Sequence, residues 1–238
     1  MAIDRWLLEQ HRLGLHPPTL RFYTWESATI SLGYHQRQWP EFWNHLTWQG
    51  VPMELVRRPS GGRAVLHQGD ITYAVVTSGL PPRRREAYEK ICEFLIAGWR
   101  SLGLELHYGT AGRGYIHNPS CFATATEADL VSACGGKFIG SAQLRRGKAI
   151  LQHGSMSLEP DRGLFSRVFE TEAPASVQLP TGDCAARTLR DRGDALIEIV
   201  VEALTDAASR CFGVEFVRQP LSESEWQAIR QVSSQLLK

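Results

Sequence analysis

A strand pattern over residues 128–158 constrains the fold more than any other feature of the sequence. Three runs that favour strands, residues 128–134, 138–144 and 149–158, follow one another with short breaks. The breaks hold a Gly-Gly and an Arg-Gly pair, which are typical of tight turns between antiparallel strands. The sequence therefore predicts a three-stranded antiparallel meander, against which the rest of the chain must pack.

Elsewhere, helix and strand patterns alternate without the β-α-β rhythm of a parallel sheet. Apolar spacing predicts helices over residues 3–12, 84–102, 161–169, 192–211 and 222–237. Shorter strands are predicted over residues 20–34 (in two pieces), 53–58, 64–67, 71–77, 104–108 and 214–217, and loops over 109–121 and 176–184. We therefore expect the α+β class: a single domain spanning residues 1–238, with a central mixed β-sheet flanked by helices.

Composition excludes several classes of protein. Hydrophobic residues make up 43% of the 238 and charged residues 21%, which is globular rather than disordered. The net charge of +1 argues against a nucleic-acid-coating surface, and no apolar run is long enough to span a membrane. Five cysteines without CxxC spacing predict neither a disulfide framework nor a metal site. We expect a cytoplasmic protein.

The first candidate binding segment is RRPSGGRAVLH, residues 57–67. Two adjacent glycines let the backbone approach a ligand closely, and neighbouring arginines can pair with phosphate or carboxylate. The segment matches neither a Walker A loop nor a GxGxxG fingerprint, and a plain hairpin turn with solvated arginines is the alternative. Its candidate binding residues are Arg58, Ser60, Gly61, Gly62, Arg63 and His67.

A second candidate is GKFIGSAQ, residues 136–143, in the middle strand of the meander. Lys137 could meet a carbonyl or phosphate oxygen, whereas an exposed turn lysine is the alternative. The small residues Gly140, Ser141 and Ala142 leave space over the strand for a ligand. In the next strand, His153 and Gly154 could contact the same ligand, although a lone strand histidine is more often structural.

Cys121 is the candidate nucleophile. It lies in the predicted loop segment NPSCF, residues 118–122. Cys92, Cys134 and Cys211 fall in predicted helices or strands, where cysteine is usually buried and inert. A loop cysteine is more accessible, and a nearby cation would lower its pKa and favour the reactive thiolate.

The order of four motifs resembles one enzyme superfamily. RRPSGGRAVLHQGDITY, NPSCF, GGKFIGSAQ and LQHGSM together resemble the biotin/lipoate protein ligases and the lipoyl/octanoyl transferases, from the first helix to about residue 158. The chain is most similar to the cysteine-dependent octanoyltransferase branch. There a cysteine that becomes acylated precedes the strand lysine by about this spacing, as Cys121 precedes Lys137 by sixteen residues.

The resemblance implies a biotin/lipoate ligase-type catalytic domain that moves an octanoyl group from acyl carrier protein to a lysine of a lipoyl domain. The acceptor would be glycine cleavage H protein or a dehydrogenase E2 subunit. Cys121 would carry the acyl group, and Lys137 would activate the cysteine. The RRPSGG loop, called the glycine loop below, and residues 140–142 would form the walls of the acyl tunnel. No cofactor, metal, nucleic acid or membrane partner is implied.

Two other interpretations fit the same sequence. In an ATP-dependent lipoate–protein ligase, Arg58, Gly61, Gly62 and Lys137 would hold an acyl-adenylate made with ATP and Mg. A non-catalytic scaffold that binds acyl carrier protein is the third. The chain departs from the family where Arg63 replaces a third loop glycine. A strand also normally precedes the first helix, so we expect that this strand is absent or that the protein starts before Met1.

Overall fold

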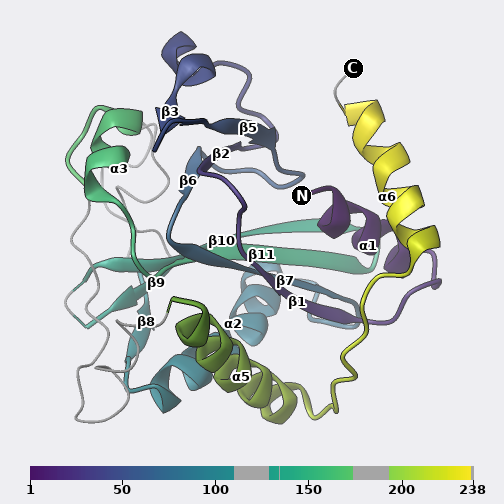
Figure 1. Ribbon diagram of the computed structural model, residues 1–238. Coiled ribbons are helices and arrows are strands. Elements are labelled where there is room, and N and C mark those ends of the chain that lie inside the picture. The colour runs from purple at the N-terminus through teal and green to yellow at the C-terminus, as the bar shows by residue number, and fades with distance from the viewer. Residues whose placement is uncertain (110–128, 134, 174–192, 237–238) are drawn as a thin grey trace.

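The central element of the fold is a six-stranded sheet. The computed structural model describes residues 1–109, 129–133, 135–173 and 193–236 (Figure 1). The strand order is β1-β7-β11-β10-β9-β8, and every neighbouring pair is antiparallel. The strands are β1 (Thr19–Tyr23), β7 (Asp70–Thr77), β11 (Ala149–Ser157), β10 (Lys137–Arg146), β9 (Asp129–Ser132) and β8 (Leu106–Tyr108). Strands β9, β10 and β11 confirm the predicted meander.

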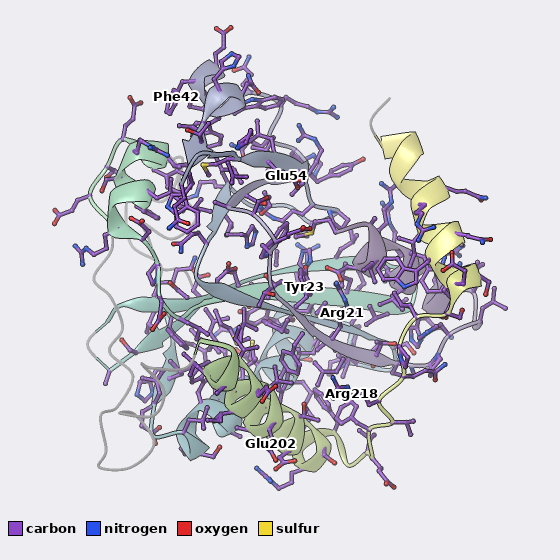
Figure 2. All side chains as sticks on the ribbon, viewed as in Figure 1. Arg21, Tyr23, Phe42, Glu54, Glu202 and Arg218 are labelled. Atoms are coloured by element: carbon purple, nitrogen blue, oxygen red, sulfur yellow. The ribbon has the colours of Figure 1, made fainter. Side chains whose placement is uncertain are left out.

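Two helices cover one face of this sheet. They are α2 (Arg84–Ser101) and α5 (Gly193–Phe212), which Figure 1 shows below the sheet. Both helices bury one apolar stripe against the strands: Ile91 and Phe94 from α2 and Val200 and Leu204 from α5 belong to the largest core cluster. Glu202, on the outer side of α5, is exposed (Figure 2). Burial of these stripes removes the apolar face of each element from water, which is the main force that holds the layers together.

The opposite face is shared between helices and a second sheet. Helices α1 (Ala2–Arg12) and α6 (Glu223–Leu236) lie side by side at one end and bury Trp6, Leu7 and Ile229 against β7 and β11 (Figure 1). A serine caps the start of α6, because the Ser222 hydroxyl accepts a hydrogen bond from the backbone N–H of Glu225 at 3.3 Å.

The second sheet has the order β5-β2-β6 and lies above the central sheet in Figure 1. Its strands are β2 (Thr29–Leu32), β5 (Glu54–Arg57) and β6 (Val65–His67). A separate core cluster supports it, built with η1 (Glu41–His45), α3 (Arg162–Phe169) and Trp48 of β3 (Thr47–Trp48). Strand β3 pairs with the exposed β4 (Val51–Pro52). At its centre the fully buried Trp43 donates from its indole N–H to the Val168 carbonyl at 2.8 Å.

The predicted α+β class is confirmed, with two differences in detail. The expected mixed sheet is divided in two: the central sheet is antiparallel, and the parallel pair β2–β5 lies in the second sheet. The strand predicted over residues 214–217 is wrong. Strand-forming side chains stabilise a strand only beside a partner, and this segment pairs with no described strand and leaves Val217 84% exposed.

Some predictions fall outside what the structure describes. The predicted loops at 109–121, apart from Gly109, and at 176–184 lie outside the described residues. No helix within the described ranges combines the length and the apolar character that crossing a membrane would require.

Candidate functional site

A cavity of about 100 Å³ lies between the central sheet and the second sheet. Its floor is a row of residues that face one another across four strands: Thr72 on β7, Ser155 on β11, Gly140 on β10 and Asp129 on β9. The floor is open because Gly140 has no side chain. The roof comes from β2, from β6 and from the loop between β5 and β6: Ser31, Arg58, Gly61, Gly62, Val65 and His67.

Lys137 reaches this cavity because of a β-bulge. The pairing of β10 with β9 shifts register between Lys137 and Ile139, so Phe138 is an extra residue in β10. Phe138 and Ile139 both belong to the core under α2 and α5, and the Phe138 ring meets Trp99 edge-on at 4.7 Å. Simple alternation would place Lys137 on the side of Ile139, but beyond the bulge it lines the cavity.

The ammonium of Lys137 is held by a carboxylate. Its Nζ lies 2.8 Å from Oδ1 of Asp129, and the two side chains are only 2% and 4% exposed. A buried ammonium is strongly unfavourable without such a partner, so the pair explains how a lysine can occupy the cavity wall.

Arg58 stabilises the glycine loop, which joins β5 to β6 in the roof of the cavity. Its Nη1 donates to the Ser31 carbonyl at 2.7 Å, its Nε and Nη2 donate to the Gly61 carbonyl at 3.2 and 3.0 Å, and its Nη2 donates to the Arg63 carbonyl at 2.5 Å. The guanidinium of Arg58 thus binds backbone oxygens in this structure. We infer that Arg58 fixes the shape of the loop around the cavity.

Glycine is required at two points of the roof. Gly62 has φ +98°, a conformation that residues with a side chain rarely adopt. A Cβ atom on Gly33 would lie 1.8 Å from the Gly62 carbonyl oxygen, so the two backbone segments touch. The turn after β2 and the loop before β6 are therefore packed directly against each other.

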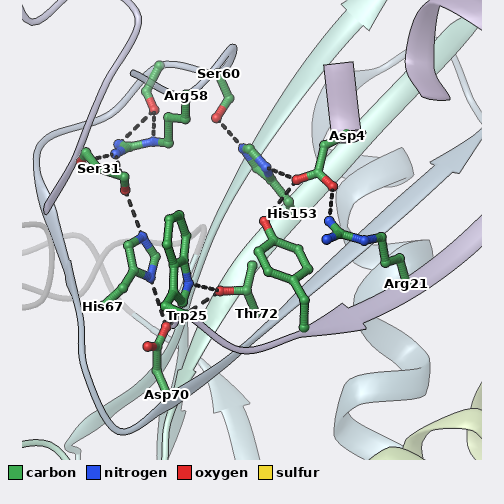
Figure 3. Close-up of polar contacts among 12 residues, drawn as sticks. Asp4, Arg21, Trp25, Ser31, Arg58, Ser60, His67, Asp70, Thr72 and His153 are labelled. Atoms are coloured by element: carbon green, nitrogen blue, oxygen red, sulfur yellow. Dashed lines mark hydrogen bonds and ion pairs between the residues drawn. The ribbon is translucent and has the colours of Figure 1, made fainter. Parts of the chain in front are cut away.

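A buried chain of polar groups joins the roof to α1 through His153 (Figure 3). The His153 Nε2 lies 2.5 Å from the Ser60 Oγ, and its Nδ1 lies 3.5 Å from Oδ2 of Asp4. Asp4 also accepts hydrogen bonds from Arg21 at 2.7 Å and from the Tyr23 hydroxyl at 2.9 Å. Arg21 and Tyr23 both come from β1, with the guanidinium 3.8 Å from the centre of the Tyr23 ring (Figure 2).

The electrostatics of this chain favour a neutral imidazole beside a carboxylate. Burial lowers the pKa of His153 below the ordinary histidine value, and the hydrogen bond to Asp4 opposes this only in part. Burial by itself would raise the pKa of Asp4, but the hydrogen bond from His153 and the nearby positive charges hold that pKa well below the aspartate range. His153 therefore donates from Nδ1 to Asp4 and accepts at Nε2 from the Ser60 hydroxyl.

A second polar chain runs through His67. Its Nε2 lies 2.8 Å from the Ser31 Oγ, and its Nδ1 lies 2.8 Å from Oδ2 of Asp70, which also accepts from Ser155 at 2.5 Å. Trp25 stacks on the His67 ring at 4.0 Å (Figure 3). Both Ser-His-Asp chains resemble hydrolase triads, yet Ser31 and Ser60 are fully buried, so we interpret the chains as braces between roof and floor.

The structure brings most of the predicted site residues to one cavity. Ten of them line it: Arg58, Gly61, Gly62, His67, Lys137, Gly140, Ser141, Ala142, His153 and Gly154. Ser60 and Arg63 are not among the lining residues and contact the site through His153 and Arg58. Cys121 lies outside the described residues.

The sequence prediction missed several residues of the site. Ser31, Val65, Thr72, Asp129 and Ser155 also line the cavity. The buried partner of His153, Asp4, could have been found from the sequence. A carboxylate beside Ile3, Trp6 and Leu7 on one helix face is unusual unless it has buried partners.

The described cysteines do not resemble nucleophiles. Cys92 is fully buried, and burial raises the pKa of its thiol to about 12. Burial also raises the pKa of Cys211, which is partly exposed on α5. Both thiols are therefore protonated near neutral pH, when the thiolate is the reactive form.

Comparison with known proteins identifies the family. The chain belongs to the family described as the lipoyl protein ligase A/B catalytic domain, which matches residues 1–207. A relative named octanoyltransferase LipM from Kyrpidia tusciae is 36% identical, with 100% of this chain and 91% of the relative covered. Another, from Carboxydothermus hydrogenoformans, is 36% identical and covers 100% and 89%. These relatives confirm the predicted acyltransferase enzyme.

Solved structures confirm the fold. Protein Ta0514 from T. acidophilum superposes with a TM-score of 0.75 at 25% identity, covering 98% of this chain and 88% of the other. A lipoate-protein ligase A bound with ATP gives a TM-score of 0.73 at 24% identity, with 98% and 87% covered.

Proposed function

We propose that the protein is an octanoyltransferase that moves an octanoyl group from acyl carrier protein to a lysine of a lipoyl domain. The observation that supports this most directly is the buried Lys137, which faces a cavity floored by Gly140 and roofed by the glycine loop. The relatives that align over the whole of this chain are named octanoyltransferases, which supports octanoyl as the transferred group.

The reaction exchanges a thioester for an amide in two steps. In the first, the Cys121 thiolate attacks the thioester of the carrier, and the pantetheine thiol leaves with a proton from solvent. In the second, the unprotonated amine of the acceptor lysine attacks the acyl-enzyme, loses its extra proton, and releases the Cys121 thiolate. Neither step consumes a nucleotide or needs a metal.

Lys137 supplies positive charge to this chemistry. A neighbouring cation favours the thiolate of Cys121, and the same ammonium can face the carbonyl oxygen where negative charge develops in each tetrahedral intermediate. The open floor at Gly140 and Ala142 would hold the start of the acyl chain.

The braced loop favours the transferase over an ATP-dependent ligase. Arg58 would be a natural contact for the phosphate of an acyl-adenylate, yet its guanidinium donates to three backbone carbonyls. A phosphate at this place would have to replace those acceptors.

An intact-mass measurement tests the proposal. The protein is incubated with octanoyl-acyl carrier protein in the absence of ATP, and then with an unmodified lipoyl domain or H protein. We expect a gain of one octanoyl group on the enzyme, which the acceptor then removes. Octanoylation of the acceptor that requires ATP and free octanoate would instead assign a ligase, and a lack of any adduct under both conditions would leave the binding scaffold.

A further inference from the structure

The geometry points to Asp129 as the residue that positions Lys137 for the reaction. This inference rests on the proposed function and assigns a role to a residue that its acyl-transfer steps leave unused. Asp129 stands at the end of the floor row, directly opposite Gly140 on β10. Its Oδ1 lies 2.8 Å from the Lys137 Nζ.

The strand pairing places both groups on the same face of the sheet. Asp129 pairs with Gly140, and residues that face each other across neighbouring strands point to the same side. Lys137 would point to the other side but for the bulge at Phe138. Trp99 contacts the inserted Phe138 ring from α2, which keeps the extra residue in the core and the lysine in the cavity.

The carboxylate fixes the position of the Lys137 ammonium. Lysine carries its charge on a flexible four-carbon stem, so an unrestrained ammonium would spend little time at any one point. In the proposed transfer, the ammonium must remain near the carbonyl oxygen while charge develops there. The pair as a whole is neutral and therefore far less unfavourable to bury than a lone ammonium.

Asp129 acts only through Lys137 in this scheme and makes no contact with the acyl group. Substitution of Asp129 should therefore affect kcat much more than the KM for the acceptor. Asp129→Asn keeps an oxygen near the ammonium but removes the charge, whereas Asp129→Glu keeps the charge on a longer stem.

Chemical labelling tests the pair without reference to activity. The sequence has four lysines, Lys90, Lys137, Lys148 and Lys238. Reductive methylation followed by peptide mass mapping can thus follow each amine separately. We expect Lys137 to be methylated far more slowly than Lys148 in the wild type. In Asp129→Asn the methylation rate of Lys137 should rise at least about tenfold, because local opening then exposes the amine more often. Asp129→Glu should keep labelling slow, as should the control Asp206→Asn, an exposed site on α5.

Kinetics test the positioning role itself. Octanoyl transfer by Asp129→Asn should show kcat reduced about 100-fold with little change in KM, and Asp129→Glu should recover most of it. If Asp129→Asn folds poorly, the double variant Asp129→Asn, Lys137→Met should regain the melting temperature while staying inactive, because it removes the buried ammonium.

Each result decides one question. Lys137 methylated at the wild-type rate in Asp129→Asn would overturn the pair, and an unchanged kcat in that variant would overturn the positioning role. Lack of octanoyl transfer by the wild type would refute the proposed function, while the labelling rates would still decide whether Asp129 holds Lys137.

Discussion

The Ser60 hydroxyl and the His153 imidazole join the roof of the cavity to its floor, with 2.5 Å between Oγ and Nε2. Ser60 belongs to the glycine loop, whereas His153 comes from the centre of the main sheet. His153 accepts from Ser60 only while it is neutral. The direction of this hydrogen bond therefore depends on the protonation state of His153, because a protonated Nε2 would donate to the Ser60 oxygen instead.

This contact predicts a pH dependence of stability. Because the pKa of His153 is lowered in the folded protein, the unfolded chain binds more protons just below the ordinary histidine pKa of about 6.5. Folded stability is therefore fully present above that pH and is lost as pH falls toward the folded value. Asp4, whose pKa is held far lower, contributes no change between pH 7 and pH 5.5. Each 1 kcal/mol lost should lower Tm by roughly 2–4 °C.

Thermal unfolding at pH 7 and pH 5.5 measures the effect. The decrease in Tm on acidification should be smaller in His153→Gln, which cannot titrate, than in the wild type. The control His35→Gln changes an exposed histidine and should keep the wild-type decrease. Equal decreases in His153→Gln and the wild type would show that another group is responsible.

The two loop glycines should respond differently to alanine. Gly62 has φ +98°, and a Cβ there would lie 2.8 Å from the Arg58 Nη2, so Gly62→Ala should lower stability by about 1–2 kcal/mol and reduce transfer strongly. At Gly61, no described atom lies within 4 Å of an added Cβ, so Gly61→Ala should keep the wild-type Tm. Chemical denaturation of the pair tests this, and equal stabilities would show that the loop tolerates a side chain at Gly62.

Cys121 should be the residue that carries the acyl group. Peptide mapping of octanoylated protein should find the adduct on Cys121, and Cys121→Ala should abolish both the adduct and transfer. Cys121→Ser should trap an ester, because an oxygen ester yields to amine attack more slowly than a thioester. Cys211→Ser is the matched control and should remain active. An octanoyl group mapped to Cys184, the other cysteine in a predicted loop, would contradict the assignment.

Lys137 should accelerate the acylation step. Removing one group that stabilises a developing oxyanion typically lowers kcat by about 10²–10³, so Lys137→Ala should slow adduct formation by that order. It should also shift adduct formation to higher pH, because the thiolate loses a neighbouring cation. Time-resolved intact mass across pH measures both effects. Lys148→Ala, in the turn between β10 and β11, should behave as the wild type, and normal rates in Lys137→Ala would remove the lysine from the mechanism.

The elements whose patterns are local were predictable from the sequence. The meander followed from strand runs separated by glycine turns, and α2 and α5 followed from apolar spacing. The clustering of Gly61, Gly140 and His153 around one cavity also matched the prediction. Here the resemblance to the superfamily contributed more than any single motif, because each motif alone also fitted a plain turn or strand.

What could not be predicted depends on contacts between distant segments. Asp4 meets His153 across 149 positions of the chain, and no local pattern specifies such a pair. The hydrogen bonds from Arg58 to backbone carbonyls depend on how the turn at Gly33 packs against the loop, which no local pattern shows. Asp129 was missed because its pairing with Lys137 requires an irregularity in β10 that alternation alone does not show.

The bulge at Phe138 divides β10 into two stretches of opposite parity. On one side of it, Gly140 and Ala142 share a face of the sheet with Ser155 and His153, and on the other side Lys137 joins that face. Closing the bulge without removing a residue would give β10 simple alternation and would turn Lys137 toward the apolar core under α2. An insertion at Gly147, in the hairpin loop, would leave this alternation intact. One extra residue in β10 thus decides which side chains of this strand face the cavity.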